Sequence, residues 1–489
     1  MLHHERRSYR FSILRCYRVS FLCSYFFDFH LLLISKYMNP SSRHLKNLAA
    51  VVTTFALLWF GINIYIGTRA EIRLHEMVEA SKKSHSYRLS NLHHQRGLIA
   101  SDGYMDVVMI DECGTMSRPE WMSVRVTYQL KHSVFPLALV NIDWSIEPLG
   151  EERETFQKLF AGQARLAGQG KVGLNGDLHS DMNLPEIHWS SSGTQLTVSP
   201  SVGSIAVGKD TLKLDWRTGK IGVRGNGSAL AMDGLGMQID LANAARGLGK
   251  VAFTIDKIAT SDFIADGLSL VTLMQENADR IDINITPSMK LLEAGGKQFK
   301  NLVLDFGIHG LHGASTEYVL NLAQTSCNFQ NLTQQEQVKL KDNLRKLLFE
   351  GFSVGISRVA GTVDGGDLDG KWLTTLAKTQ GEEFSLMPAM TSQGELTLTG
   401  KDIQQQQRKT LVSLGFAKEV PNGVQASYEY ANGNLKINGK VSNAALINTM
   451  LQNIDQQIRS FLTGQQIRLN GGGSTEEELI DPPSEEVET

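Results

Sequence analysis

The chain has 489 residues, of which 42% are hydrophobic and 20% charged, so it can bury a core and is not disordered throughout. Its 48 Lys+Arg against 51 Asp+Glu give a formal net charge of -3, which argues against a nucleic-acid-binding surface. Four cysteines are too few for a disulfide-dense scaffold, and 45 glycines against 11 prolines indicate many turns between short strands. None of these averages indicates an activity.

The first 37 residues differ from the rest of the chain. Residues 1–37 carry six basic and two acidic side chains, and their apolar stretch Val19–Ser35 is interrupted by Asp28 and His30, which disfavour membrane insertion. Met38 opens MNPSSRHLKN, a more ordinary start for a protein with a single anchor. We interpret residues 1–37 as an extension upstream of the start at Met38. The alternative is a second hydrophobic hairpin, which would reverse the membrane topology.

Leu48–Gly67 is the strongest membrane signal in the chain. It reads LAAVVTTFALLWFGINIYIG, without a formal charge, and at 1.5 Å per residue a helix of this length spans ~30 Å, enough to cross a bilayer core. The alternatives are a buried core helix and a cleaved signal peptide, but Gly61–Ala70 offers no clean small-x-small cleavage site. We therefore expect an uncleaved transmembrane anchor that contacts the lipid bilayer.

The orientation of the anchor depends on its flanking bases. Arg43 and Lys46 precede the segment and Arg69 and Arg73 follow it, so the local count is a tie. The basic residues of 1–37, where they are translated, favour a cytoplasmic N-terminus.

The body that follows reads as an α+β protein, mainly antiparallel β. Ala70–Lys82 continues in helical style and predicts a stalk helix, whereas residues 87–140 and 166–320 alternate between apolar and polar side chains. In residues 212–216, for example, Leu212, Leu214 and Trp216 alternate with Lys213 and Asp215, as expected of half-buried strands. We expect residues 70–470 to form one β-rich exported body.

Helical and turn signals return after residue 333. Thr333 and Glu336 form a capping box, and an apolar stripe follows at helical spacing from Leu340 to Phe352. The sequence also predicts helices over Gln404–Gly415 and Leu446–Ile458, and residues 471–489, with seven acids and no base, as a disordered tail. Between these helices, Asn432-Gly433 in SYEYANGNLKING predicts a tight β-hairpin.

Candidate chemical motifs are weak throughout the chain. Gly222–Gly227 lacks the P-loop spacing, His93-His94 has no accompanying ligand cluster, and the Asp364, Asp367 and Asp369 group lacks the spacing of a calcium loop. Cys113 and Cys327 are equally compatible with a disulfide and with two unpaired thiols. We therefore expect no catalytic, metal or cofactor-binding residues.

Three short motifs resemble a known bacterial family. The first is Arg96-Gly97-Leu98-Ile99 followed by Ser101; the second is Tyr430–Gly439, which contains Asn432 and Gly433. The third, His132–Leu137, matches a family His-Gly-Pro-Phe-Pro-Leu stretch at His132, Phe135 and Pro136 but has Ser133-Val134 in place of Gly-Pro. Together with the anchor and stalk they resemble the YdgA-like bacterial envelope proteins, a domain of unknown function (945), over about Met38–Gln465.

The resemblance implies an inner-membrane protein of a Gram-negative bacterium with a periplasmic body, and it supplies no catalytic residues. We interpret the motif residues as structural: glycine for a turn, arginine for pairing with a carboxylate or carbonyl. An anchored β-rich body without a catalytic constellation favours a non-enzymatic module that handles a lipid or another apolar ligand. The alternative is a structural protein that self-associates, as a homo-oligomer, through the Leu340–Phe352 or Leu446–Ile458 stripe.

Overall fold

The computed structural model describes residues 43–82, 84, 87–110, 120–132, 139–150, 152–159, 166–191, 193–225, 227–326, 329, 332–363, 365–380, 384–400 and 405–463. The chain divides into two compact units. Unit 1 comprises residues up to Leu184 together with Ser204–Lys209, and unit 2 comprises Pro185–Gly203 and the residues from Asp210 onward.

Unit 1 is one long helix packed on an antiparallel sheet. The helix, α2, runs from Arg43 to Ser81 without interruption, so the predicted anchor and stalk form a single element. Successive strands of the sheet pair in chain order. The strands are β1 (Tyr87–Arg96), β2 (Ala100–Ile110), β3 (Glu120–His132), β4 (Val140–Pro148), β5 (Leu166–Val172) and β6 (Leu178–Leu184), and a short helix, α3 (Glu152–Leu159), follows β4.

The two halves of α2 have different surroundings. Within the described residues, Val51–Ser81 is the one segment that is long and apolar enough to span a membrane. Large apolar side chains such as Phe55 and Leu58 are exposed in the N-terminal half. Ile66, by contrast, is buried in a core with Tyr128, Leu130 and Val140 of the sheet, and further along α2 Ala70 and Leu74 pack against the same core. Burial of this apolar face holds the C-terminal half of the helix on unit 1.

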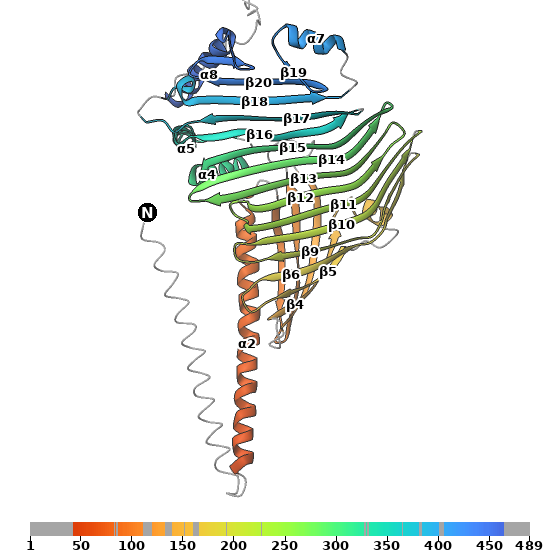
Figure 1. Cartoon of the computed structure of the whole chain (residues 1–489). Helices are drawn as coiled ribbons and strands as arrows, with labels where there is room; N and C mark the ends of the chain where they lie inside the picture. Colours follow the sequence, from red (N-terminus) through yellow and green to blue (C-terminus); the bar gives the residue numbers. More distant parts are fainter. Residues whose placement is uncertain are drawn as a thin grey trace, which may run out of the picture. The chain divides into compact units, whose positions relative to one another are not determined.

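Unit 2 is built on an antiparallel meander (Figure 1). From β10 to β18 each strand pairs with the next, β18 then pairs with β20, and β8 pairs with the other edge of β10. β9 (Ser201–Val207) is divided between the two units. The strands are β7 (Ile187–Ser191), β8 (Thr194–Val198), β10 (Leu212–Gly225), β11 (Ser228–Asn243), β12 (Leu248–Ala259), β13 (Phe263–Asn277), β14 (Arg280–Ala294), β15 (Lys297–His312), β16 (Phe352–Val363), β17 (Gly366–Leu376), β18 (Met390–Thr399), β19 (Lys418–Val420), β20 (Gly423–Ala431), β21 (Asn434–Ile437) and β22 (Lys440–Ser442).

A line of positive-φ residues bends this sheet. Gly234 in β11, Gly267 in β13 and Asn301 in β15 have φ values of 66°, 62° and 52°. The register places the three close to one line across neighbouring strands, next to the paired residues Asp233, Lys257, Asp266, Leu291 and Lys300. Figure 1 shows the strands from β11 to β15 bending towards one end. The register from β11 to β15 is the same on both sides of this line, so within these strands the residues act as kinks, which curve a sheet, and not as β-bulges.

Most helices of unit 2 lie at one end of its strands: α4 (Gly313–Thr325), α5 (Gln334–Glu350), α6 (Leu386–Ala389) and α8 (Ala445–Thr463). Helix α7 (Gln405–Ser413) lies at the other end, beside β19 (Figure 1). Leu376, Phe384 and Ala389 form a buried cluster, to which α5 contributes Leu348 and α8 contributes Ile458. The predicted capping box is present: Thr333 Oγ1 accepts a hydrogen bond from the Glu336 amide, and the Glu336 carboxylate accepts one from the Thr333 amide.

The predicted fold class, a mainly antiparallel α+β protein with an N-terminal apolar helix, is confirmed. Two details of the prediction are wrong. Phe352 is not part of the α5 stripe, because α5 ends at Glu350 and the positive φ of Gly351 (73°) turns the chain into β16. The β region ends at His312 rather than near residue 320, because α4 begins at Gly313. The predicted tail, residues 471–489, lies outside the described residues.

Candidate functional site

The unit 2 sheet has one apolar and one polar face, and β14 shows the pattern most clearly. Ile281, Ile283, Ile285, Pro287 and Met289 project from one face, and they alternate along the strand with Asp282, Asn284, Thr286, Ser288 and Lys290. Because directly paired residues of antiparallel strands share a face, the strand register extends this division to the neighbouring strands. We call the side of Ile285 and Pro287 the apolar face.

On the apolar face, apolar residues or glycine occupy one line that crosses ten strands. The pairs Trp216–Met237, Met237–Phe253, Phe253–Leu270 and Leu270–Pro287 lie in register across five strands. The line continues through Leu304, opposite Pro287 in the β14–β15 register, to the paired residues of β16, β17, β18 and β20. We call this line the apolar stripe: Trp216, Met237, Phe253, Leu270, Pro287, Leu304, Val359, Gly370, Leu396 and Ala426.

The apolar stripe is accessible over much of its length. Met237, Phe253, Leu270 and Leu396 are between 37% and 43% exposed. Neighbouring strands lie about 4.8 Å apart, so ten strands give the stripe a length of roughly 40 Å. The hydrocarbon core of a bilayer, which holds two layers of acyl chains, is ~30 Å thick. One extended acyl chain therefore fits within the length of the stripe.

A cavity of about 470 Å³ lies along the centre of the stripe. Its walls are predominantly apolar, and it extends from β12 to β17. Members of the stripe form part of its lining together with Leu268, Met289, Leu302 and Leu368 on the same face. Ligand cavities in proteins are typically of this size and this apolar character.

Near its C-terminal strands the apolar face carries a small polar cluster. Ser392 Oγ lies 3.0 Å from the Tyr428 hydroxyl and 2.7 Å from Thr374 Oγ1, and it accepts a hydrogen bond of 3.2 Å from Trp372 Nε1. A second cavity, of about 410 Å³, touches Trp372 and Tyr428 and also the exposed Phe416. The face therefore joins apolar walls to a few hydroxyl groups that can hydrogen-bond to the polar end of a ligand.

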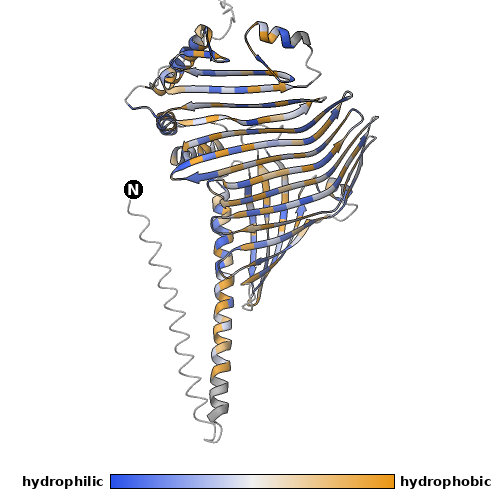
Figure 2. Ribbon diagram, in the orientation of Figure 1, coloured by the Kyte–Doolittle hydropathy of each residue, from blue (hydrophilic) through white to orange (hydrophobic). Residues whose placement is uncertain are grey.

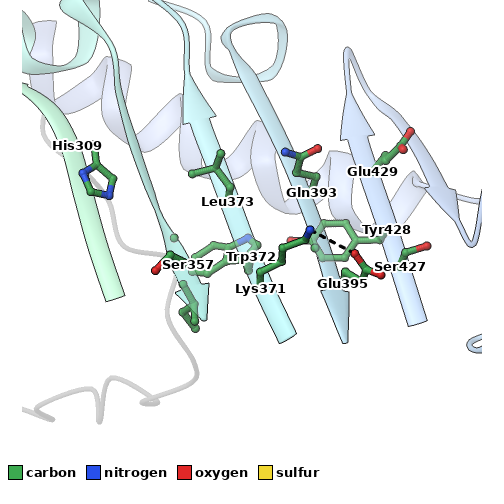
Figure 3. Close-up of a pocket in the computed structure, with 13 residues that line it drawn as sticks. His309, Ser357, Lys371, Trp372, Leu373, Gln393, Glu395, Ser427, Tyr428 and Glu429 are labelled. Atoms are coloured by element: carbon green, nitrogen blue, oxygen red, sulfur yellow. Dashed lines mark ion pairs between the residues drawn. The ribbon is translucent and has the colours of Figure 1, made fainter. Parts of the chain in front are cut away.

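A third cavity, of about 400 Å³, reaches the polar face (Figure 3). Lys371 Nζ lies 3.5 Å from a Glu395 carboxylate oxygen, and His309, Gln393 and Glu429 also line the cavity. Lys371 is well exposed, so this ion pair is of the surface kind, which contributes little to stability. The lining offers hydrogen-bonding groups, but the interactions among its described residues include no nucleophile–base pair.

The predicted motif residues of unit 1 meet at the junction between α2 and the sheet. Arg96 Nη1 donates a hydrogen bond of 3.0 Å to Thr68 Oγ1 and lies 3.7 Å from the Glu71 carboxylate. Ser101 Oγ lies 3.1 Å from His132 Nε2, and His132 Nδ1 lies 3.2 Å from the carbonyl oxygen of Leu98. A side chain at Gly97 would collide with the Ala100 carbonyl, which accounts for glycine there. Phe135 and Pro136 lie outside the described residues.

The second motif forms a hairpin clamped to α8. Asn432 and Gly433, with φ values of 50° and 76°, make the two-residue turn between β20 and β21. The hydroxyl of the buried Tyr430 donates a hydrogen bond of 2.8 Å to Asn448 Oδ1, and Asn448 Nδ2 donates one of 2.9 Å to the Gly433 carbonyl. Burial raises the pKa of Tyr430. All of these contacts lie within the protein.

The remaining sequence candidates are dispersed. His94 Nδ1 lies 3.1 Å from the Tyr128 hydroxyl; burial lowers the pKa of His94 and raises that of Tyr128 to about 12. Within the described part of the chain, no group of three His, Cys, Asp or Glu side chains is placed to hold a metal ion. Gly222 and Gly225 lie in β10, Gly227 in the following turn, and Asp367 and Asp369 in β17, whereas Cys113, Cys327 and Asp364 lie outside the described residues.

Comparison with known proteins identifies the family. A family model described as a bacterial protein of unknown function (DUF945) matches residues 44–402. The chain belongs to this family. The predicted YdgA-like resemblance is consistent with it, and the match covers unit 1, α2 included, and most of the unit 2 strands of this DUF945 protein. No curated protein and no solved structure matches the chain.

The sequence did not reveal the apolar stripe. Its only sequence signal was the alternation of single strands, such as that of Leu214 and Trp216 in β10. The stripe depends on the register of ten strands, and register is set by turns and bulges whose positions a single sequence leaves open.

Proposed function

We propose that this DUF945 protein is an inner-membrane-anchored module with a periplasmic body, and that its unit 2 sheet binds the acyl chain of a lipid along the apolar stripe without catalysing a reaction. The observation that carries the proposal is the stripe itself, a continuous apolar line over ten strands whose members include Phe253 and Leu270, each about 40% exposed. Burying such a surface against an acyl chain is favourable by about 0.8 kcal/mol per methylene group.

The composition of the two faces supports an apolar ligand. A protein face that carries large apolar patches without a covering element marks a binding site. Figure 2 shows orange and blue residues alternating along the strands of the sheet, as expected when apolar side chains collect on one face. Helices α5, α6 and α8 contribute to the buried cluster at one end of the sheet, around Leu376 and Met390, whereas the members of the stripe other than Gly370 stay at least partly exposed.

The anchor supports a lipid as the ligand. The exposed apolar half of α2 matches the length of a bilayer core, so lipid would be the most abundant apolar compound near the body. The match to a bacterial family of unknown function is compatible with this proposal but names no ligand.

Site-specific photocrosslinking in cells tests the proposal. The photoreactive amino acid p-benzoylphenylalanine is placed at Phe253 or Leu270, and at Thr254 as the control, because Thr254 neighbours Phe253 but projects from the polar face. We expect radiolabelled phospholipid adducts at Phe253 and Leu270 and not at Thr254. Adducts at none of these positions, or equally at all three, would contradict the proposal.

A pair of substitutions gives an independent measurement. Leu270→Asp places a charge in the stripe, whereas Ser269→Asp places the same charge one residue earlier on the opposite face. We expect lipid that co-purifies with the full-length protein to fall at least several-fold with Leu270→Asp and to stay unchanged with Ser269→Asp. Mass spectrometry of the extracted lipid provides the readout.

One observation favours the second candidate function, self-association. Leu446, Ile447, Met450 and Ile454 are exposed along one side of α8, whereas Leu340 of the other predicted stripe is buried. Light scattering of the full-length protein in detergent tests whether the protein self-associates through α8. Self-association through α8 predicts an oligomer that Met450→Glu dissociates and the control Gln452→Glu does not, and a monomer at all concentrations contradicts it.

A further inference from the structure

Strand β1 runs back along α2 in the opposite direction. At one end the Leu89 amide donates a hydrogen bond of 2.9 Å to Ser81 Oγ, and at the other Arg96 Nη1 donates one of 3.0 Å to Thr68 Oγ1. The helix covers roughly 20 Å between its two contacts, at 1.5 Å per residue, and the strand covers roughly 23 Å, at 3.3 Å per residue. Since the two lengths agree, β1 lies alongside the C-terminal half of α2.

The turn after β1 therefore extends beyond the end of the stalk. Gly67 is the last residue of the uncharged stretch Leu48–Gly67, and its α-carbon faces the Arg96 side chain. Leu98 follows Arg96 by two residues, which is at most roughly 7 Å or about four residues of helix, so it lies between the levels of Thr68 and Ile64. Leu98 is 44% exposed and Ile99 56% exposed. Two apolar side chains thus lie at the level of the last turn of the membrane segment.

The turn of the β5–β6 hairpin lies at the same end of the unit 1 sheet as the β1–β2 turn. His132 pairs with Val140, Val140 pairs with Val172, and the Leu139 amide donates a hydrogen bond of 2.8 Å to the Val172 carbonyl. The β5–β6 turn follows Val172 directly, and its Leu174 is 71% exposed. Figure 1 shows the strands of unit 1 ending part-way along α2, and Figure 2 shows the apolar part of α2 continuing beyond them.

The adjacent part of α2 has the chemistry of a membrane interface. Arg69 Nε donates a hydrogen bond of 3.1 Å to the Tyr65 hydroxyl, and both side chains are exposed. Tyrosine and basic residues at the end of an apolar helix are typical of the headgroup layer of a bilayer. The exposed turns and this pair lie at the same end of unit 1 along α2.

We propose that the β1–β2 and β5–β6 turns insert Leu98, Ile99 and Leu174 into the headgroup layer of the bilayer that α2 spans. The inference rests on the anchor of the proposed function and is independent of the apolar stripe. Unit 1 then contacts the bilayer at three places, α2 and two turns, and the junction formed by Arg96, His132 and Gly67 fixes the depth of the turns relative to the helix.

Fluorescent depth probes test this inference on the full-length protein in lipid nanodiscs. Cys16, Cys23, Cys113 and Cys327 are replaced by serine, and an environment-sensitive nitrobenzoxadiazole label is attached to a single new cysteine. The labelled variants are Leu98→Cys and Leu174→Cys at the turns and Leu57→Cys within the apolar half of α2. The control is Tyr87→Cys, at the opposite end of β1 and similarly exposed at 42%.

We expect the labels at positions 98 and 174 to emit at shorter wavelength than the label at 87 and to be quenched most by lipids that carry a nitroxide near the headgroup. The label at 57 should be quenched most by nitroxides deep in the acyl chains. Labels at 98 and 174 that behave like the label at 87, while 57 is quenched, overturn the inference and leave the anchor intact. Absence of quenching at 57 overturns the anchor and, with it, this inference.

Discussion

Gly67 of α2 lies directly against His132 at the end of β3: a Cβ atom on Gly67 would be 3.1 Å from His132 Cε1. The same atom would lie 3.2 Å from Cγ and Cδ of Arg96. Both contacts are shorter than ordinary van der Waals separations, so the helix approaches the sheet as closely as it does because position 67 has no side chain. Two of the three family-motif segments therefore meet at one glycine of the apolar helix.

A large side chain at this glycine should loosen α2 from unit 1. We expect Gly67→Leu to destabilise the helix–sheet junction by about 1–3 kcal/mol, the usual range for overpacking a close contact. Hydrogen exchange of the full-length protein in detergent should show faster exchange in β1 and at the end of β3. The control is Gly61→Leu, because no atom lies within 4 Å of a Cβ there, and equal exchange in the two variants would contradict the prediction.

The Asp106–Arg125 pair should make unit 1 sensitive to acid. Arg125 Nε and Nη2 donate hydrogen bonds of 2.7 and 3.0 Å to the two oxygens of Asp106, whose side chain is 5% exposed. These bonds hold the pKa of Asp106 below its usual value, and a hydrogen bond from Asn91 adds to the effect. Burial of the carboxylate acts in the opposite direction but is outweighed. A carboxyl whose pKa is lower in the folded state stabilises that state above its unfolded pKa of about 3.9, and the contribution is lost as the pH falls through the folded value.

We therefore expect Asp106→Asn to cost about 1.5–3 kcal/mol at pH 7, because the buried side chain at position 106 then loses its charge-assisted hydrogen bonds with the partly exposed Arg125. Thermal unfolding between pH 7 and pH 2 should show the wild type and the variant converging at the acid end. Asp143→Asn is the matched control: its pair with Lys131 is equally short, at 2.6 Å, but exposed, and should contribute less than about 1 kcal/mol. A wild-type advantage that persists below the folded pKa of Asp106 would contradict the assignment.

Tyr430→Phe should weaken the attachment of the C-terminal hairpin to α8. The variant removes the hydroxyl that donates to Asn448 Oδ1 and leaves that oxygen without this donor, which costs about 1–3 kcal/mol when the acceptor is buried. Tyr428→Phe, two residues earlier, is the control, since Ser392 keeps its bonds to Trp372 and Thr374. Native-state hydrogen exchange of β20, β21 and α8 should increase in the first variant only.

Local signals predicted the elements that local forces determine. The capping box at Thr333 and the turn at Asn432-Gly433 were found because each needs only neighbouring residues, and the alternation of Leu212, Leu214 and Trp216 predicted β10. Helix α4 was missed because its N-cap is His312, whose ring accepts from the Ser315 amide, and histidine is not among the preferred capping residues.

The candidate sites depend on contacts between residues that are distant in the chain, so they could not be predicted from the sequence. Arg96 and His132 were recognised only as parts of family motifs, and nothing in the sequence pairs them with Gly67 on α2. The apolar stripe, in turn, needs the register of strands from Trp216 to Ala426. A shift of one residue in any strand would place that strand's stripe residue on the polar face, so the stripe is a property of the assembled sheet.

The bend of the unit 2 sheet should depend on Gly234. Its φ of 66° is unfavourable for any residue with a side chain, and a Cβ atom there would also lie 2.8 Å from the Cβ of Asp256 on the neighbouring strand. Gly295, in the β14–β15 turn, has a similar φ of 56° but no atom within 4 Å of a Cβ. Comparing alanine at the two positions therefore separates backbone strain from the steric effect at the bend.

We expect Gly295→Ala to destabilise unit 2 by about 1–2 kcal/mol from backbone strain alone, and Gly234→Ala by a further 1–3 kcal/mol because Asp256 must move. Asp256 follows Ile255, which lines the central cavity, so this movement should also reach the stripe. Lipid crosslinking at Phe253 should accordingly fall in Gly234→Ala and stay near the wild-type level in Gly295→Ala. Equal losses of stability and of crosslinking in both variants would show that strain anywhere in the sheet is sufficient to reduce lipid binding. Lipid binding would then not depend on the bend at Gly234.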